Sequence, residues 1–88
     1  MSNFEFKDIE YVRAIIENKS FTKAAQSLFI TQPTLSQYIK NMHKRLKMKI
    51  LRVDGKSVML THEGAVFYEK GLQLLLERDK LLNDMNES

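Results

Sequence analysis

Two helix starts and one tight break lie within FTKAAQSLFITQPTLSQYIK, residues 21–40. Ser20, immediately before this stretch, is a natural N-cap, because its hydroxyl oxygen can accept a hydrogen bond from a free N–H of the first helical turn. Thr31 is a second N-cap candidate, and Pro33 follows within a first helical turn, where its missing N–H costs little. The break between the helices falls at residues 29–30. The pattern therefore predicts a short helix, a tight turn and a longer helix.

The longer helix is predicted from about residue 32 to residue 47, and its two sides are unlike. Its apolar side chains recur at spacings of four, three and four residues, which confines them to a narrow arc. They are Leu35, Ile39, Met42 and Leu46. The rest of its surface carries amide, hydroxyl and basic side chains and lacks acids: Gln32, Pro33, Thr34, Ser36, Gln37, Lys40, Asn41 and Lys44. We expect the apolar side to enter a shared core and the polar side to face outward.

A helix precedes these two helices and a hairpin follows them. Upstream, apolar residues recur at steps of three and four between Phe6 and Ile16, which is the pattern of an amphipathic helix. Downstream, two β-prone runs, residues 50–53 and 58–60, flank an Asp-Gly pair. Because glycine tolerates positive φ, Asp-Gly between two such runs is a strong hairpin signal.

Thr61 is predicted to cap a last helix over roughly residues 62–86, along which two apolar stripes run. One stripe can cover the domain's own core: Ala65, Tyr68, Leu72, Leu75 and Leu82. The other needs a partner, and we assign it to dimerisation: Phe67, Leu74, Leu81 and Met85. Apolar residues on two sides of a surface helix are typical of association. We therefore predict a homodimer that pairs through this helix.

Taken in order, these elements predict a mainly α fold. Residues 1–60 are expected to form a winged helix-turn-helix of three helices and a β-hairpin wing, and residues 61–88 a long dimerising linker helix. A chain of 88 residues can build one modest core, and its 43% hydrophobic content is sufficient for that.

Composition argues against an enzyme and against a cofactor. The absence of cysteine excludes disulfides, thiolate metal sites and a cysteine nucleophile. His43 and His62, the only histidines, are nineteen residues apart, which is not metal-ligand spacing, and we interpret both as surface residues. No apolar run approaches the ~20 residues of a membrane span, and no signal peptide follows Met1. We expect a soluble, cytoplasmic protein with no metal, no cofactor and no membrane partner.

The mild net charge of +3 conceals a segregation of charges. Residues 19–56 hold nine basic side chains and one acid, a net of +8, whereas the rest of the chain sums to −5. A lysine-rich, solvated surface is the plainest interpretation. A basic block flanked by acidic segments instead favours a surface that meets a polyanion, and we prefer that interpretation.

The polar side of the longer helix matches what a DNA duplex offers. Lys and Arg bind phosphates and position a protein, but they do not read sequence. Amide and hydroxyl side chains read base edges, and four of them lie at the N-terminal part of the helix: Gln32, Thr34, Ser36 and Gln37. Helices of this motif enter the major groove by that end. We predict sequence-specific binding of double-stranded DNA, with Lys44 on a phosphate and the two helices of a dimer about 34 Å apart on a pseudo-palindrome.

Three strings resemble the amino-terminal domain of LysR-type transcriptional regulators: Ser20-Phe21-Thr22 with Ala24-Ala25, Thr31-Gln32-Pro33-Thr34-Leu35-Ser36, and Leu60-Thr61-His62-Glu63-Gly64. The resemblance covers about residues 4–86. It implies a bacterial DNA-binding domain whose last helix is a dimerising linker, and a small-molecule effector that acts only through a C-terminal domain absent from this chain. The DNA-contacting positions that it implies are Ser20, Thr22, Gln32, Pro33, Thr34, Ser36, Gln37 and Lys40, to which we add the cap residue Thr31.

Several positions depart from the family pattern. Gln37 stands where Arg is frequent, so we expect a different base preference, and Lys47 stands where Gly is usual. The family's wing Arg falls on Val53, and Arg52 lies one place earlier, on the opposite face of a strand. Lys56 at the hairpin tip is therefore the first candidate for a DNA contact by the wing, and Arg52 is the second.

Two other binding functions compete with this interpretation. A winged helix can serve as a protein-interaction or dimerisation module that reads no DNA sequence. The last helix would fit that role, but the strongly basic segment does not. Double-stranded RNA is disfavoured because its A-form major groove is too deep and narrow for a helix. These motifs do not encode the target sequence, the inducer or the choice between activation and repression. Because the chain ends at Ser88, we expect an excised domain or an unusually short protein.

Overall fold

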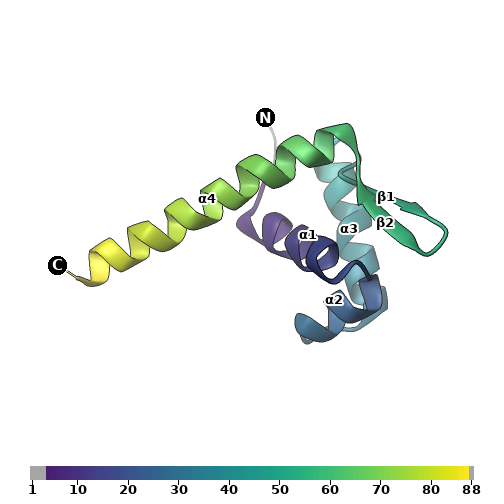
Figure 1. Cartoon of the computed structure of the whole chain (residues 1–88), viewed down its shortest axis with the longest axis horizontal. Coiled ribbons are helices and arrows are strands. Elements are labelled where there is room, and N and C mark those ends of the chain that lie inside the picture. The colour runs from purple at the N-terminus through teal and green to yellow at the C-terminus, as the bar shows by residue number, and fades with distance from the viewer. Residues whose placement is uncertain (1–3, 88) are drawn as a thin grey trace.

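A computed structural model describes residues 4–87, which form four helices and one antiparallel hairpin. Their bounds in chain order are α1 Phe6–Asn18, α2 Phe21–Ser27, α3 Gln32–Leu46, β1 Leu51–Asp54, β2 Ser57–Leu60 and α4 His62–Asn86. The predicted order of elements is confirmed, and so is the winged helix-turn-helix architecture. In Figure 1, α1, α2 and α3 form a cluster from which the hairpin projects on one side, while α4 extends away on the other.

Side-chain caps begin the helices. Ser20, Thr31 and Thr61 each accept a hydrogen bond through the hydroxyl oxygen from the backbone N–H three residues later, at 3.1, 3.2 and 2.9 Å. These three predicted N-caps are confirmed, and each satisfies an N–H group that a first turn leaves without a helical partner. α1 begins with a capping box that was not predicted, in which the Asp8 carboxylate accepts from the Glu5 N–H at 3.0 Å.

The core lies between α1, α2 and α3 and is closed by the start of β1. Its side chains are fully or almost fully buried: Val12, Ile15, Ala24, Ala25, Leu35, Ile39, Met42, Ile50 and Leu51. Full burial of a Leu, Ile or Met stabilises the fold by about 1.5–3 kcal/mol. The apolar side predicted for α3 therefore does enter the core, with Leu46 half-buried at its end. Burying this side leaves the opposite side of α3 to face solvent.

The turn between α2 and α3 depends on one residue in an unusual conformation. Phe29 has a left-handed backbone, with φ of 59°, and its side chain is 95% exposed. This conformation costs a residue with a Cβ about 1–2 kcal/mol. It reverses the chain within a few residues, and the Ile30 N–H then donates to the Ala25 carbonyl oxygen at 3.0 Å.

The predicted hairpin is confirmed and forms the wing, which we define as β1, β2 and the two residues between them. Leu51 pairs with Leu60 and Asp54 with Ser57, so the connection consists of residues 55–56. Gly55 supplies the positive φ, 63°, that the tight connection needs. Leu51 is buried, whereas the rest of β1 is exposed. The wing is thus anchored at its base and projects into solvent at its tip.

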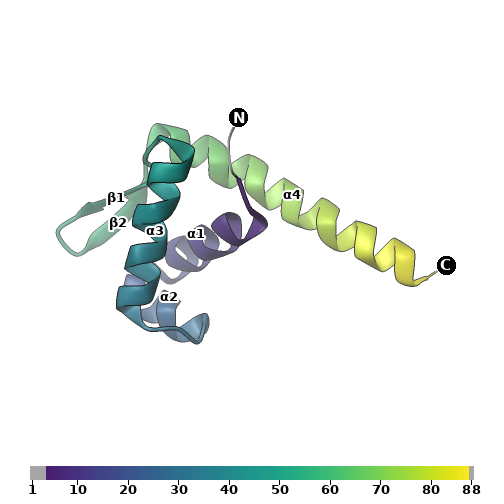
Figure 2. The ribbon, with the colours of Figure 1, turned by 180° about the vertical axis from the view of Figure 1, so that it is seen from behind.

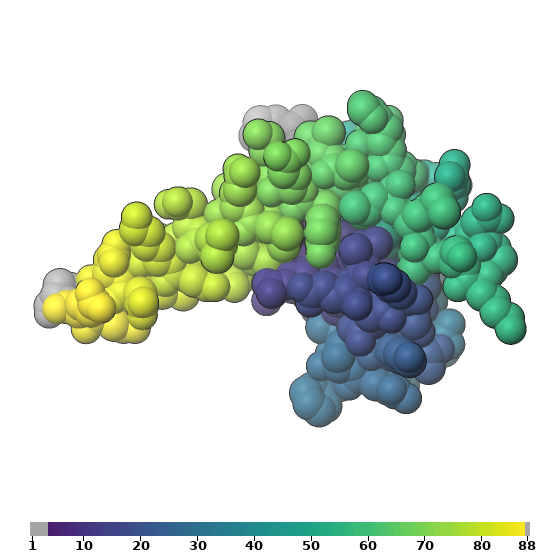
Figure 3. All heavy atoms as spheres, viewed as in Figure 1, coloured from purple at the N-terminus to yellow at the C-terminus, as the bar shows by residue number. Residues whose placement is uncertain are grey.

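The first half of α4 packs against the cluster and the second half does not. Its buried residues are Gly64, Gly71 and Leu75, and residues 79–87 are all exposed. Figure 3 shows the end of α4 standing clear of the other elements. One stripe assignment is wrong: Leu82, expected to cover the core, is 52% exposed. Phe67, assigned to dimerisation, also packs in part against the chain's own core. None of the helices within residues 4–87 has the length and apolarity needed to cross a bilayer.

Candidate nucleic-acid interface

The side of α3 that faces solvent carries the polar residues predicted to read DNA. In Figure 2, α3 lies in front of α1, and its length is open to the viewer. We define the outward face of α3 by its exposed residues, which are Gln32, Pro33, Thr34, Gln37, Lys40, Asn41 and Lys44. Ser36 lies at the edge of this face and is half-buried. No acidic side chain occurs on α3, so the outward face carries positive charge alone.

Hydrogen bonds within the outward face orient its amide and hydroxyl groups. The Gln37 Nε2 donates to the Asn41 Oδ1 at 3.0 Å, one helical turn further along. At the start of the helix, the Thr31 hydroxyl donates to the Thr34 Oγ1 at 2.8 Å while it also serves as the N-cap. Such side chains are held in defined positions before any ligand arrives, which lowers the entropic cost of binding.

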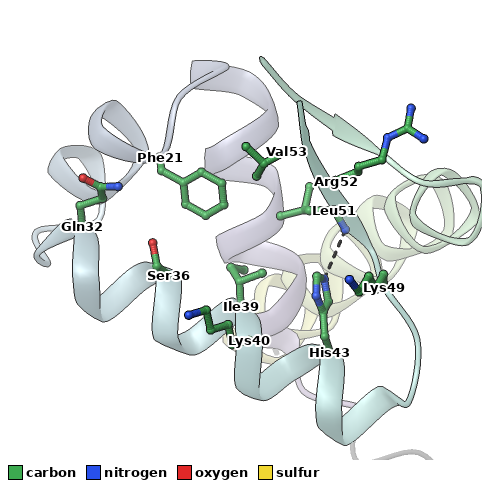
Figure 4. Close-up of a pocket in the computed structure, with 10 residues that line it drawn as sticks. All are labelled: Phe21, Gln32, Ser36, Ile39, Lys40, His43, Lys49, Leu51, Arg52 and Val53. Carbon is green, nitrogen blue, oxygen red and sulfur yellow. Dashed lines mark hydrogen bonds between the residues drawn. The ribbon is translucent and has the colours of Figure 1, made fainter. Parts of the chain in front are cut away.

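A groove of about 470 Å³ lies between α3 and β1 and is closed at one end by α2 (Figure 4). Phe21, Ile39 and Leu51 contribute apolar surface to it, and Gln32 and Ser36 border it on the α3 side. Phe21 is the residue between Ser20 and Thr22. The groove therefore brings the start of α2, where DNA contacts by Ser20 and Thr22 were predicted, next to the N-terminal half of α3.

Three cations line this groove, and sequence reasoning had singled out two of them. Lys40 comes from α3, Lys49 from the turn before β1 and Arg52 from β1. No acidic residue is among the side chains that line it. Lys49 was counted in the basic block but not named as a site residue, because a lysine in a short turn carries no motif. A concave strip with cations on both sides is suited to a phosphodiester strand.

The wing contributes further positive charge. Lys56 lies in the exposed connection at the tip, as predicted. Arg52 is also exposed, and in Figure 4 its guanidinium extends away from the middle of the groove. Its Nη2 lies 3.1 Å from the sulfur of Met59, the residue with which it pairs across the hairpin. Arg52 and Lys56 are therefore both accessible to a ligand that lies along α3.

The side chain of Arg45, a member of the basic block, is not on this surface. Arg45 turns away from the outward face and binds the fully buried Asp8 through two hydrogen bonds, of 3.1 Å from Nη1 and 2.6 Å from Nη2. The Tyr38 hydroxyl donates to the same carboxylate. The charge of Arg45 is thus balanced inside the protein, and the interpretation of the whole block as a polyanion surface is wrong for this residue. Its role is to join α3 to α1.

The Asp8 carboxylate is held in its ionised form. Burial acts to raise its pKa, but hydrogen bonds from Arg45, Tyr38 and the Glu5 N–H outweigh burial and bring the pKa below the ordinary value. Burial and the adjacent carboxylate raise the pKa of the Tyr38 hydroxyl, so that it remains a donor. The cluster is therefore a charged, fully hydrogen-bonded link between the first helix and the third.

His43 is not the surface residue that was expected. Its ring is half-buried, and its Nε2 accepts hydrogen bonds from the Ile50 N–H at 3.0 Å and the Leu51 N–H at 3.3 Å. Burial and the nearby Lys49 lower its pKa. No sequence signal could have found these bonds, because they cross a turn whose geometry the motifs do not define. His62, in contrast, is exposed as predicted.

Comparison with known proteins agrees with this geometry. Residues 6–65 match the family model described as "Bacterial regulatory helix-turn-helix protein, lysR family". The chain is 41% identical over 83 residues to the uncharacterized HTH-type transcriptional regulator YcgK of Bacillus subtilis, covering 94% of this chain and 26% of that protein. It is 37% identical over 79 residues to the HTH-type transcriptional regulator BenM of Acinetobacter baylyi, covering 90% of this chain and 26% of BenM.

A solved structure has the same arrangement of elements. The structure described as BenM_DBD/benA site 1 DNA complex superposes with a TM-score of 0.89 at 34% identity, over 96% of this chain and 94% of that one. The present chain spans about a quarter of the length of the curated relatives it matches.

Proposed function

The chain belongs to the lysR family of bacterial regulatory helix-turn-helix proteins, and we propose that it is the part of a transcriptional regulator that binds double-stranded DNA in a sequence-specific way. The observation that carries this proposal is the acid-free outward face of α3, where amide and hydroxyl side chains lie between lysines. The likeness to the BenM domain solved with DNA supports it. The protein would act in the bacterial cytoplasm, where the chromosome lies.

In this proposal the N-terminal half of α3 enters the major groove, which at about 12 Å wide admits one helix. Gln32 and Gln37 are suited to adenine, because a side-chain amide can donate its N–H to adenine N7 and accept from the N6 amine in a bidentate pair. Lys40 and Lys44 would lie beside the phosphates that border the groove. Lys56 at the wing tip would reach the next stretch of backbone. The charges position the protein, and the amides supply the specificity.

Replacing Gln37 by alanine should weaken binding to the preferred site by about 1–3 kcal/mol and relax discrimination at one base pair. Lys44→Ala is the matched control on the same face. Because Lys44 meets a phosphate in this account, its loss should weaken binding to all sequences alike and reduce the slope of log K against log salt by about one. Dissociation constants measured on the preferred duplex and on its single-base variants, at several salt concentrations, separate the two.

An equal loss for Gln37→Ala on every duplex would show that this side chain does not read a base. Binding that is insensitive to both substitutions would favour the alternative function, a winged-helix module that associates with proteins.

We further propose that two copies pair through α4. The support is the row of apolar side chains that the chain leaves exposed beyond its own core. Leu74 is 45%, Leu81 59% and Met85 62% exposed, and Phe67 continues the same row where it meets the core. Exposed apolar residues in a row on a helix that projects from its domain favour association with a partner helix. A two-fold dimer would place its two α3 helices on the half-sites of a pseudo-palindrome.

Leu81→Glu should convert the dimer to a monomer, because a carboxylate in the middle of a helix–helix contact would be buried without a partner. Leu76→Glu is the control, since Leu76 is 70% exposed and its position in the helix points away from the row that contains Leu74 and Leu81. Sedimentation equilibrium gives both molecular masses. A dimer that survives Leu81→Glu, or that is lost equally with Leu76→Glu, would contradict this interface.

A further inference from the structure

His43 connects α3 to the base of the wing. It lies near the end of α3, and its Nε2 faces the backbone N–H groups of Ile50 and Leu51, the two residues that bring the chain into β1. Figure 4 shows the ring directed at the strand, with the bond drawn. The side chains of Ile50 and Leu51 are 0% and 4% exposed, so this segment is fixed in the core. The imidazole therefore sits at the hinge between α3 and the wing.

We propose that His43 is a positioning residue for DNA binding: its unprotonated Nε2 holds the wing at a fixed angle to α3, and protonation of the ring releases the wing. This inference rests on the proposed function, because it assumes that α3 and the wing contact the same duplex. His43 would not touch the DNA itself in order to act. Its contribution is to keep Lys49, Arg52 and Lys56 at fixed positions relative to the outward face of α3.

The chemistry of the ring makes this contact dependent on protonation. A neutral imidazole has one nitrogen with a free lone pair and one that carries a proton. With Nε2 accepting two hydrogen bonds, the proton must be on Nδ1. The imidazolium has N–H groups at both positions, so a protonated Nε2 would face two N–H donors and lose both bonds. An unpaired amide next to the core is unfavourable, and the base of β1 would have to move.

The charges around His43 oppose its protonation in the free protein. The charged groups that line the groove with it are all cations, namely Lys40 on α3, Lys49 in the turn and Arg52 on β1, while α2 contributes only the uncharged Phe21. Burial and Lys49 together lower the pKa of the imidazole. The bonds to Ile50 and Leu51 are therefore intact at neutral pH and are lost as the pH falls below the ordinary range of a histidine.

His43 acts on the strand of the wing that packs less against the helices, because Val58 and Leu60 of β2 pack against the core. Each strand has four residues, and most of β1 is exposed. A two-stranded hairpin of this size is marginal by itself in water. Thr61 fixes the other end of the base, since its Oγ1 donates to the Lys49 carbonyl oxygen at 2.6 Å. That bond joins the turn before β1 to the start of α4, whereas His43 joins the same turn and the first residue of β1 to α3.

The test compares DNA binding by the whole chain at pH 7.5 and pH 5.5 for three proteins. For the wild type we expect affinity for a selected duplex to fall on the order of tenfold at the lower pH, the equivalent of one or two lost hydrogen bonds. His43→Gln keeps an oxygen acceptor that does not titrate in this range, so its affinity should change little with pH. His62→Gln removes the exposed histidine and should behave as the wild type. A wild-type affinity that is unchanged or higher at pH 5.5, or a His43→Gln protein with the wild-type pH dependence, would overturn the inference.

A second measurement needs no DNA and separates this inference from the proposed function. Long-range ¹H–¹⁵N spectra of the free protein should show His43 with its proton on Nδ1. The amide resonances of Ile50 and Leu51 should shift with the midpoint of the His43 titration, and in His43→Gln they should not titrate. The inference would be refuted, even if DNA binding is established, by a proton on Nε2 at neutral pH. It would also be refuted if the amide resonances of Ile50 and Leu51 did not shift during the His43 titration. If instead the spectra agree but no duplex binds, the proposed function fails and the contact remains.

Discussion

Replacing Asp8 by asparagine should destabilise the protein by about 3 kcal/mol, because it leaves Arg45 with a neutral partner in a partly buried site. Asp8 is fully buried and accepts from Arg45, Tyr38 and the Glu5 N–H. For a domain of this size the loss corresponds to a fall of roughly 15 °C in the melting temperature. Chemical denaturation followed by circular dichroism measures the free energy of unfolding. The substitution should also weaken DNA binding, since the bonds of Asp8 to Arg45 and Tyr38 hold α3 against α1.

The control is Glu10→Gln, which removes a carboxylate from the same helix. Glu10 lies 3.6 Å from Arg78 in a solvent-exposed pair, and such pairs contribute about 0–1 kcal/mol. Equal losses for the two variants would mean that Asp8 acts only as one more surface acid. A loss of unfolding free energy below about 1 kcal/mol for Asp8→Asn would show that the Asp8, Arg45 and Tyr38 cluster is not an important link between α1 and α3.

The stability difference between the wild type and Asp8→Asn should depend on pH. The folded pKa of Asp8 lies below its ordinary value of 3.8. Its contribution to stability is therefore complete above that value and is lost as the pH falls through the folded pKa. The difference in unfolding free energy between wild type and Asp8→Asn should be constant from pH 5 to 7 and should shrink below pH 3.8.

Gly64→Ala should destabilise the protein by about 3 kcal/mol or more, although alanine is the better helix former. A Cβ at this position would lie 2.0 Å from the backbone oxygen of Ile50, which cannot move as a side chain could. That oxygen also accepts from the Thr61 N–H at 3.0 Å, so the clash would disturb the junction between the wing and α4. Thermal unfolding of the purified variant and of the wild type gives the change in unfolding free energy.

Gly71→Ala is the matched control on the same helix, with the same gain in helix propensity. There the added Cβ would lie 3.0 Å from the Ile9 Cγ2, a side-chain atom that can yield. The Gly71 variant should therefore lose less stability than the Gly64 variant. If the two are equally stable, the close approach of α4 to Ile50 is not the reason for the glycine.

Local features of this fold could be predicted from the sequence, because their causes lie within a few residues. Ser20, Thr31 and Thr61 cap helices by bonding three residues ahead, so residue type and position were sufficient. The buried side of α3 followed from a spacing that is fixed by helix geometry. The hairpin followed from the Asp54-Gly55 pair because Gly55 takes the positive φ that the connection at residues 55–56 needs.

Contacts between distant residues could not be predicted in the same way. Asp8 and Arg45 are 37 residues apart, and each looks like an ordinary charged residue on an amphipathic helix. Their meeting depends on how α1 crosses α3, which periodicity does not define. The bonds of His43 depend in turn on the path from α3 into β1. For this reason one arginine was assigned to the basic surface and one histidine to solvent.

The stripes of α4 show a third limit. Their spacing predicts which residues share a side of the helix, but not how far along it the domain extends. Leu75 is buried and Leu82 is 52% exposed, although both belong to the stripe that was expected to cover the core. The packed body of the domain, against which α4 lies, ends between these two residues. Where packing stops along a helix is a property of the tertiary structure.

The proposed DNA-binding function depends above all on whether the outward face of α3 reads bases in the major groove. Its most direct test is to select a duplex from a random DNA pool, form the complex with isotope-labelled protein and record intermolecular NOEs. We expect NOEs from Gln32, Thr34 and Gln37 to major-groove protons such as thymine methyl groups and cytosine H5. The claim is contradicted if the duplex binds while these side chains show no contact to bases, or if their NOEs lead to another protein chain.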